Sequence, residues 1–463
     1  MPDGWDADVK LPEAVDINPD PRIVEINLEA RLAKVEVSPG KVVEAWTYNG
    51  SIPGPLIRVN VGDRLIVHFT NQLPKPTTVH WHGMRIPIQM DGVPGYSQSE
   101  VQTGGTFTYD FVVPDAGLYW YHPHVDSAAQ VGFGLYGALL VQDPKEDVGV
   151  ADELVIVLSD IGIDDHGHLA DPNSGGSAGM VFGREGATVL VNGRSGRTLT
   201  ARSGVPQRWR ILNASKSRYF SLKLGSQPFT VIGTDGGLQE YPTETTNLVI
   251  GAAERLDVIV APKSSPGSEI SLYSYLYNRG YGSVEYRDPR ELLFKINFTD
   301  SAIFEAPPLP EIRRVIQPLD LTGATRVEMQ FTLDKQPDGD VLYGINGVPF
   351  SKAKPFIAKE GETQIWTLVN KTDWTHPFHL HGFFFQVLDE NDVPVRPLAW
   401  KDTVTVPLKK TVKVAVRFDE GHPGKWMMHC HILDHADGGL MGTVQVGTPP
   451  PDQPTMSGHG HAH

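Results

Sequence analysis

A turn-and-strand pattern occurs three times along the chain, and it limits the fold more than any other feature of the sequence. Each copy opens with Asn-Gly, continues through a strand-like run and a glycine-containing turn, and ends a second strand with an asparagine. The copies begin at Asn49, Asn192 and Asn346. Their spacing of roughly 150 residues is the size of a domain and far exceeds a solenoid repeat. The pattern therefore predicts three related β-sandwich domains.

Alternation of apolar and polar residues also favours strands over helices. The runs 65–69 and 411–418 are typical, and such runs are bounded by Gly, Pro, Asn or Asp. Helical periodicity is hard to find anywhere, and 47 glycines with 37 prolines agree with many turns. We predict an all-β chain with domains at 1–145, 146–306 and 307–463, divided near Pro144 and in the proline-rich stretch 307–310.

Charge and hydropathy exclude several classes of function. The chain carries 40 Lys and Arg against 55 Asp and Glu, a net charge of −15, which repels nucleic acids and anionic membranes. No apolar run approaches the length of a membrane-spanning helix. The first residues lack the basic start and apolar core of a signal peptide. We expect a periplasmic or secreted protein whose export signal is absent from this sequence, with a cytoplasmic location as the alternative.

Histidines are concentrated in four clusters, two in the first third of the chain and two in the last. Imidazole is a common metal ligand, and a His-X-His pair on a strand turns both rings to one face. Four such pairs converging at one interface would offer eight nitrogens, which suits about three metal ions. The middle third has no such pair, so we expect it to be structural. The pairs are His80 and His82, His122 and His124, His379 and His381, and His429 and His431.

The single cysteine stands inside the last of these pairs. On a strand, Cys430 points away from the face that His429 and His431 share, so it serves a second site. His376 and His435 remain to join it, and a His₂Cys set is the blue-copper arrangement for electron transfer. A blue-copper site can have a weak fourth, axial ligand, and here the position expected for it, five residues after His435, is Leu440, which cannot bind a metal. Outside the clusters, His68, His166, His168 and His422 are expected to be solvated or hydrogen-bonded.

In this order the motifs resemble the four copper-binding motifs of the multicopper oxidases, in particular the three-domain laccases. The motifs are His-Trp-His-Gly, His-Pro-His, His-Pro-X-His-Leu-His-Gly and His-Cys-His-X-X-X-His, and the similarity extends to 53–55 and 402–404. The resemblance implies three cupredoxin-like Greek-key domains and four coppers. It assigns His376, Cys430 and His435 to type 1 copper, and His80 and His379 to type 2 copper. The type 3 pair would have one copper bound by His82, His122 and His431, and the other bound by His124, His381 and His429.

The resemblance also implies a reaction. Single electrons from phenols or aromatic amines would enter at type 1 copper, pass through Cys430 to its histidine neighbours, and reduce O₂ to water. Four protons are needed as well, so a carboxylate near the cluster is expected. Asp91 matches the acidic residue of the family, while Asp126 and Asp434 are further candidates. Many bacterial members carry Glu immediately after the last type 1 histidine, where this chain has Ala436.

Three other functions remain as alternatives. A metallo-oxidase of Cu(I) or Fe(II) belongs to the same family, but only nine methionines occur and none form a Met-rich segment suited to Cu(I). A copper-free scaffold of the same fold would have lost ligands, whereas this chain keeps the ten histidines and Cys430. A two-copper nitrite reductase fits poorly with eight cluster histidines and three domains.

Overall fold

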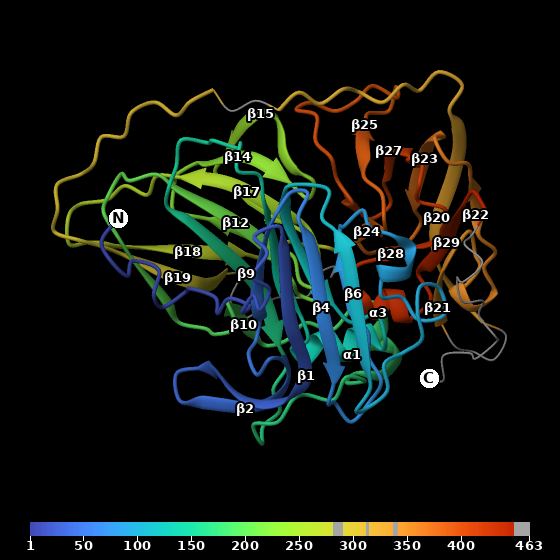
Figure 1. Ribbon diagram of the computed structural model, residues 1–463, viewed down its shortest axis with the longest axis horizontal. Helices are drawn as coiled ribbons and strands as arrows, with labels where there is room; N and C mark the ends of the chain where they lie inside the picture. Colours follow the sequence, from blue (N-terminus) through green and yellow to red (C-terminus); the bar gives the residue numbers. More distant parts are fainter. Residues whose placement is uncertain (281–289, 312–313, 337–340, 449–463) are drawn as a thin grey trace.

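The computed structural model describes residues 1–280, 290–311, 314–336 and 341–448, and within them six β-sheets pair into three sandwiches (Figure 1). The prediction of an all-β chain of three sandwich domains is therefore confirmed. The strands of the three sandwiches span 23–142, 153–298 and 325–446. The predicted boundaries after residues 145 and 306 fall between these groups.

The first sandwich packs two four-stranded sheets, ordered β2-β1-β4-β6 and β3-β8-β7-β5. β1 runs parallel to β4, and their alternate residues, such as Ile26 and Val67, face a common core. The strands are β1 (Ile23–Ser38), β2 (Lys41–Tyr48), β3 (Gly54–Asn60), β4 (Arg64–Asn71), β5 (His80–His82), β6 (Thr106–Val112), β7 (Gly117–His122) and β8 (Gly137–Gln142).

The middle sandwich has a six-stranded sheet, β10-β9-β12-β17-β14-β15, and a five-stranded sheet, β11-β19-β18-β13-β16. Trp209 and Phe294 meet edge to face in its core. The strands are β9 (Glu153–Ile161), β10 (Thr188–Val191), β11 (Arg197–Ala201), β12 (Gln207–Asn213), β13 (Phe220–Lys223), β14 (Phe229–Thr234), β15 (Gly237–Thr245), β16 (Leu248–Ile250), β17 (Arg255–Val260), β18 (Glu269–Tyr275) and β19 (Arg290–Phe298).

The third sandwich packs two five-stranded sheets, ordered β21-β20-β23-β27-β25 and β22-β29-β28-β24-β26. Its core contains Trp366, Phe378 and Trp426. The strands are β20 (Thr325–Lys335), β21 (Val341–Ile345), β22 (Phe356–Ala358), β23 (Thr363–Asn370), β24 (His376–Leu380), β25 (Phe385–Leu388), β26 (Thr403–Val406), β27 (Thr411–Arg417), β28 (Gly424–Cys430) and β29 (Met441–Val446).

The threefold repeat has the same turn geometry in each domain. Asn49, Asn192 and Asn346 have φ of 52°, 49° and 55°, a left-handed conformation that asparagine tolerates and that a tight hairpin turn requires. Each side-chain oxygen also accepts a backbone N–H from a neighbouring strand, at 2.6–2.8 Å. The repeated Asn-Gly therefore closes an equivalent corner of each sandwich.

Helices are few and short, and three of them gather where the domains meet. α1 (Ser127–Gly132) comes from the first domain, α2 (Gly176–Phe182) from the middle and α3 (Leu433–Asp437) from the third. Both α1 and α2 contact α3, and Figure 1 shows α1 beside α3. Two 3₁₀ turns, η1 (Ile88–Met90) and η2 (Phe350–Lys352), complete the elements. No helix in the described ranges is long and apolar enough to cross a membrane.

Candidate metal centres

The eight paired histidines form one buried cluster between the first and third domains. His80 and His122 are cross-strand partners in β5 and β7, and His379 and His429 are partners in β24 and β28. Across the domain interface, the rings of His80 and His381 stack with centroids 3.9 Å apart, and those of His82 and His379 at 3.7 Å. The four His-X-His motifs therefore converge as predicted, although only the pair in β5 lies wholly within a strand and the second histidine of each other pair follows the end of its strand.

Several ring nitrogens of this cluster are buried without a protein partner, as expected of metal ligands. They are Nε2 of His80, His122 and His379, Nδ1 of His82, and both ring nitrogens of His431. The Nε2 atoms of His381 and His429 face each other at 3.2 Å. A buried polar atom without a hydrogen bond is costly, and a coordinated cation would remove that cost. The donor set therefore fits copper ions held by imidazole nitrogens.

Burial keeps these imidazoles neutral, which is the form that binds metal. Desolvation lowers the pKa of His429 to about 3, and burial also lowers the pKa of His82, His122, His124 and His431. The neighbouring histidines act in the same direction because each disfavours a second positive charge.

Asp91 touches a histidine from each domain. At the end of η1, its main-chain oxygen accepts a hydrogen bond from His80 Nδ1 at 2.7 Å, and its Oδ2 lies 2.9 Å from His381 Nδ1. The second carboxylate oxygen, Oδ1, is 3.3 Å from His80 Nδ1. The structure therefore brings this predicted residue to the cluster.

Asp402 holds a matching place on the other stacked pair, and sequence reasoning gave it no role. Its Oδ1 lies 3.2 Å from His82 Nε2 and 3.3 Å from His379 Nδ1, and its main-chain oxygen accepts from His379 Nδ1 at 3.0 Å. Burial would raise the pKa of Asp402, but Arg255 of the middle domain holds it well below its usual range. The only hint in the sequence that Asp402 is important is that residues 402–404 are part of the similarity to the multicopper oxidases.

The second site contains Cys430 between two histidines. Its Sγ lies 3.3 Å from His376 Nδ1 and 3.8 Å from His435 Nδ1, and the two nitrogens are 3.1 Å apart. Burial raises the pKa of the thiol, so a cation is needed to stabilise its thiolate here. Three donor atoms converging in a buried site fit one copper ion with His₂Cys ligands.

Leu440 and Met441 pack in different places beside this site. Leu440 is 1% exposed and belongs to the core cluster that contains Cys430, and its carbonyl accepts the Cys430 N–H at 3.1 Å. Met441 packs instead with Val93, Met427 and Ala436. Of the two side chains, Leu440 is the one that shares the apolar surroundings of the sulfur.

The middle domain supplies none of the candidate ligands among the described residues, yet it covers the cysteine site. The carbonyl of Val181, in α2, accepts a hydrogen bond from His435 Nε2 at 3.1 Å and another from the Tyr343 hydroxyl at 2.8 Å. His435 is fully buried under this helix. No feature of the sequence around Val181 indicated this contact.

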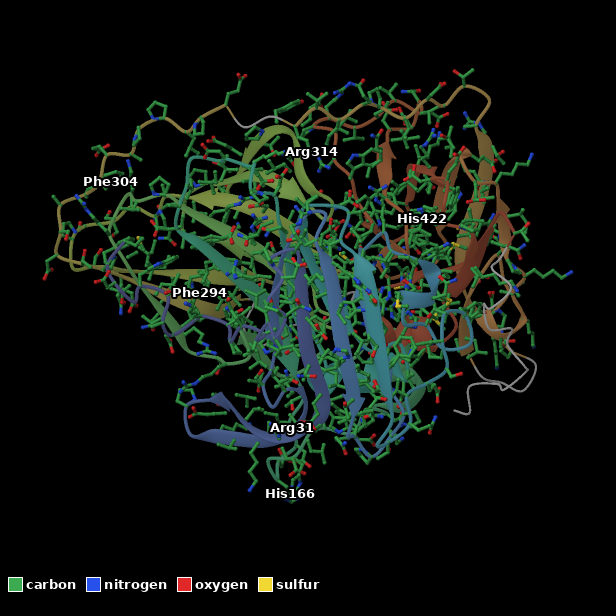
Figure 2. The ribbon with its side chains drawn as sticks, in the orientation of Figure 1. Arg31, His166, Phe294, Phe304, Arg314 and His422 are labelled. Carbon is green, nitrogen blue, oxygen red and sulfur yellow. The ribbon has the colours of Figure 1, made fainter. Side chains whose placement is uncertain are left out.

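In the described part of the chain, neither of the other two predicted acidic residues makes a hydrogen bond or ion pair with a cluster histidine. Asp434 is buried and its carboxylate pairs with Arg184 at 2.5 Å, which ties α3 to the segment after α2. Asp126 is exposed at the start of α1. Among the remaining histidines, His68 lies 2.7 Å from Glu25, and Figure 2 shows His166 at the edge of the molecule.

Comparisons with known proteins agree with this geometry. Family models described as multicopper oxidase match residues 30–146, 152–278 and 318–450. Multicopper oxidase MmcO of Mycobacterium tuberculosis is 33% identical, over 90% of this chain and 86% of that protein. A laccase of Bacillus subtilis is 27% identical, over 87% of this chain and 90% of its own length. A solved multicopper oxidase from Campylobacter jejuni, described as a metallo-oxidase, superposes with a TM-score of 0.83 at 29% identity, covering 94% of both chains.

Proposed function

This chain belongs to the multicopper oxidase family, and we propose that within it the protein is a laccase-type oxidase that takes electrons from phenols and aromatic amines and passes them to O₂. Bound copper supplies the one-electron redox chemistry and the four-electron reduction of O₂ to water. His376, Cys430 and His435 would hold one copper, and the eight clustered histidines the other three. Similarity to a laccase at 27% identity supports this class of reductant.

One observation favours an aromatic reductant. Val181, which accepts the His435 hydrogen bond, is followed by Phe182, whose side chain is 42% exposed. The Phe182 ring meets Trp374 edge to face at 5.4 Å. A phenol or aromatic amine stacked on this pair would lie one residue from the carbonyl bonded to His435, and aromatic contacts stabilise such a complex.

The chain's own residues then link the two centres. Cys430 belongs to the site covered by α2, while its two neighbours in the backbone belong to the cluster: His429 lies beside His381, and His431 beside His82. Three consecutive residues thus provide a covalent route between the centres. Asp91, whose carboxylate contacts His80 and His381, is the group that we propose to hold and release protons at the cluster.

Cu(I) oxidation is the second candidate, because α2 carries Met180 next to Val181 and a thioether is a soft ligand suited to Cu(I). Similarity to a structure described as a metallo-oxidase supports a metal ion as the reductant, without saying which ion. Fe(II) oxidation is less favoured, because it requires carboxylates near His435 and Asp434 is already paired with Arg184 and lies 3.7 Å from Lys216.

Steady-state kinetics with a phenol and with Cu(I) would separate the two candidates. Phe182→Ala should raise KM for the phenol about 3- to 10-fold, the effect of losing one aromatic contact, and leave Cu(I) oxidation unchanged. Tyr241→Ala, which removes another exposed aromatic ring of the middle domain, is the matched control. Unchanged phenol kinetics in Phe182→Ala, together with slower Cu(I) oxidation in Met180→Leu, would favour the metal-ion reaction instead.

A further inference from the structure

Arg255, the first residue of β17 in the middle domain, lies at a junction of all three domains. Its side chain is 1% exposed. Nε donates to the carbonyl of Leu118 in the first domain at 2.9 Å, and Nη1 donates to Asp402 Oδ1 in the third domain at 2.8 Å. Nη2 pairs with Asp402 Oδ2 and also donates to the carbonyl of Asp235 at 3.1 Å. The guanidinium therefore donates two parallel hydrogen bonds to the Asp402 carboxylate. This geometry fixes the orientation of the carboxylate and favours its charged form.

The orientation of Asp402 matters because it contacts two cluster histidines on their outer nitrogens. His82 Nε2 and His379 Nδ1 both lie against Asp402, while His82 Nδ1 and His379 Nε2 are buried without a protein partner. The two rings are nearly parallel, with an angle of 16° between their planes. Asp402 thus decides which nitrogen of each ring is left for the metal, through its carboxylate at His82 and through both its carboxylate and its main-chain oxygen at His379.

Gly83 leaves the space that this arrangement needs. It follows His82 with a φ of 86°, and a Cβ at this position would lie 2.5 Å from Arg255 Nη2 and 2.7 Å from Asp402 Oδ2. The glycine of the His-Trp-His-Gly motif therefore lets the pair from two other domains approach the backbone beside His82.

We propose that Arg255 is a positioning residue of the copper cluster: by clamping Asp402, it holds the rings of His82 and His379 with their inner nitrogens directed at the metal. The middle domain then acts on the cluster without supplying a ligand to it. This inference rests on the copper cluster of the family and does not depend on which reductant the enzyme uses.

Arg255→Lys tests the clamp, since lysine keeps the charge and loses the two parallel bonds. We expect the affinity of the cluster for its most weakly held copper to fall about 10- to 100-fold, as loss of an outer-shell partner usually does. Copper per chain after equilibration with a competing chelator gives this number. The EPR signal of type 2 copper should change as well, while the blue band of the Cys430 site stays as in the wild type.

Arg208→Lys is the matched control. Arg208 is another buried arginine of the middle domain, paired with Asp257 and Glu146 rather than with a residue of the cluster. Arg208→Lys should lower thermal stability about as much as Arg255→Lys does, but leave copper retention and the EPR spectrum unchanged. If Arg255→Lys also lowers thermal stability while copper retention and the EPR spectrum stay unchanged, Arg255 serves only the stability of the fold and the proposal is wrong.

Asp402→Asn provides an independent measurement should Arg255→Lys fail to fold. An asparagine has one acceptor oxygen and cannot accept both parallel bonds from Arg255, so Asp402→Asn should reproduce the copper loss. The double variant should lose no more copper than Asp402→Asn alone, because both changes act through one carboxylate. Wild-type copper retention in Asp402→Asn, or losses that add in the double variant, would overturn the proposal.

Discussion

Asp91 and Asp402 occupy corresponding places on opposite sides of the histidine cluster. Each is about 1% exposed, and each contacts one histidine of the first domain and one of the third. They differ in their other partners: Asp402 is clamped by Arg255, whereas in the described part of the chain no lysine or arginine lies within ion-pair distance of Asp91. The arginine fixes the charge and orientation of Asp402, whereas the two histidines are the charged or ionisable partners within ion-pair distance that the described residues give Asp91.

Asp91→Asn should therefore slow O₂ reduction without removing copper. The amide oxygen can still accept from His381, but the carboxylate that we propose as the proton carrier is lost, and we expect turnover to fall about 100-fold or more. Copper content and the rate at which a reductant bleaches the blue band should match the wild type. Asp126→Asn, at the rival candidate on an exposed site, should turn over at the wild-type rate if Asp91 carries the protons. Wild-type O₂ consumption by Asp91→Asn would show that protons arrive by another residue, with Asp126 the next to examine.

Cys430→Ser should abolish the blue colour and the oxidase activity while the cluster keeps its copper. The thiolate is the sulfur donor at the site between His376 and His435, and the band at about 600 nm comes from copper bonded to it. We expect copper to drop from four per chain to three, measured by elemental analysis beside the absorption spectrum. A wild-type protein that is fully loaded yet colourless would contradict the assignment.

Copper-free protein should lose stability as the pH falls below about 6.5. Burial lowers the pKa of His376 and His429 to about 3 in the folded protein. Below about pH 6.5 these histidines therefore bind protons in the unfolded chain but stay neutral in the folded one. The stability that these histidines allow is fully present above their unfolded pKa near 6.5 and decreases as the pH falls toward 3. By pH 5 the free energy of unfolding should have dropped by roughly 2 kcal/mol per histidine. Denaturant unfolding of the apoprotein between pH 7 and 5 measures it. A free energy of unfolding that is flat over this range would contradict the prediction.

Much of this arrangement could be predicted because it depends on local patterns. The Asn-Gly turns, the His-X-His alternation and the opposite direction of Cys430 follow from backbone conformation and strand geometry alone. The contacts of Val181 with His435 and of Arg255 with Asp402 could not be predicted in this way. Each joins residues far apart in sequence through the packing of one domain on another, and a backbone carbonyl or a single buried arginine leaves no periodic signal.

The last prediction concerns Leu440, which shares the apolar surroundings of the Cys430 sulfur. A thioether in an axial position donates electron density and stabilises Cu(II), whereas leucine donates none and keeps water away. Leu440→Met should therefore lower the reduction potential of the blue site and slow the oxidation of phenols that are hard to oxidise. Met441→Leu should change little, since Met441 packs with Val93 and Met427. A redox titration of both variants decides the matter: a higher potential in Met441→Leu with no change in Leu440→Met would make Met441 the axial ligand.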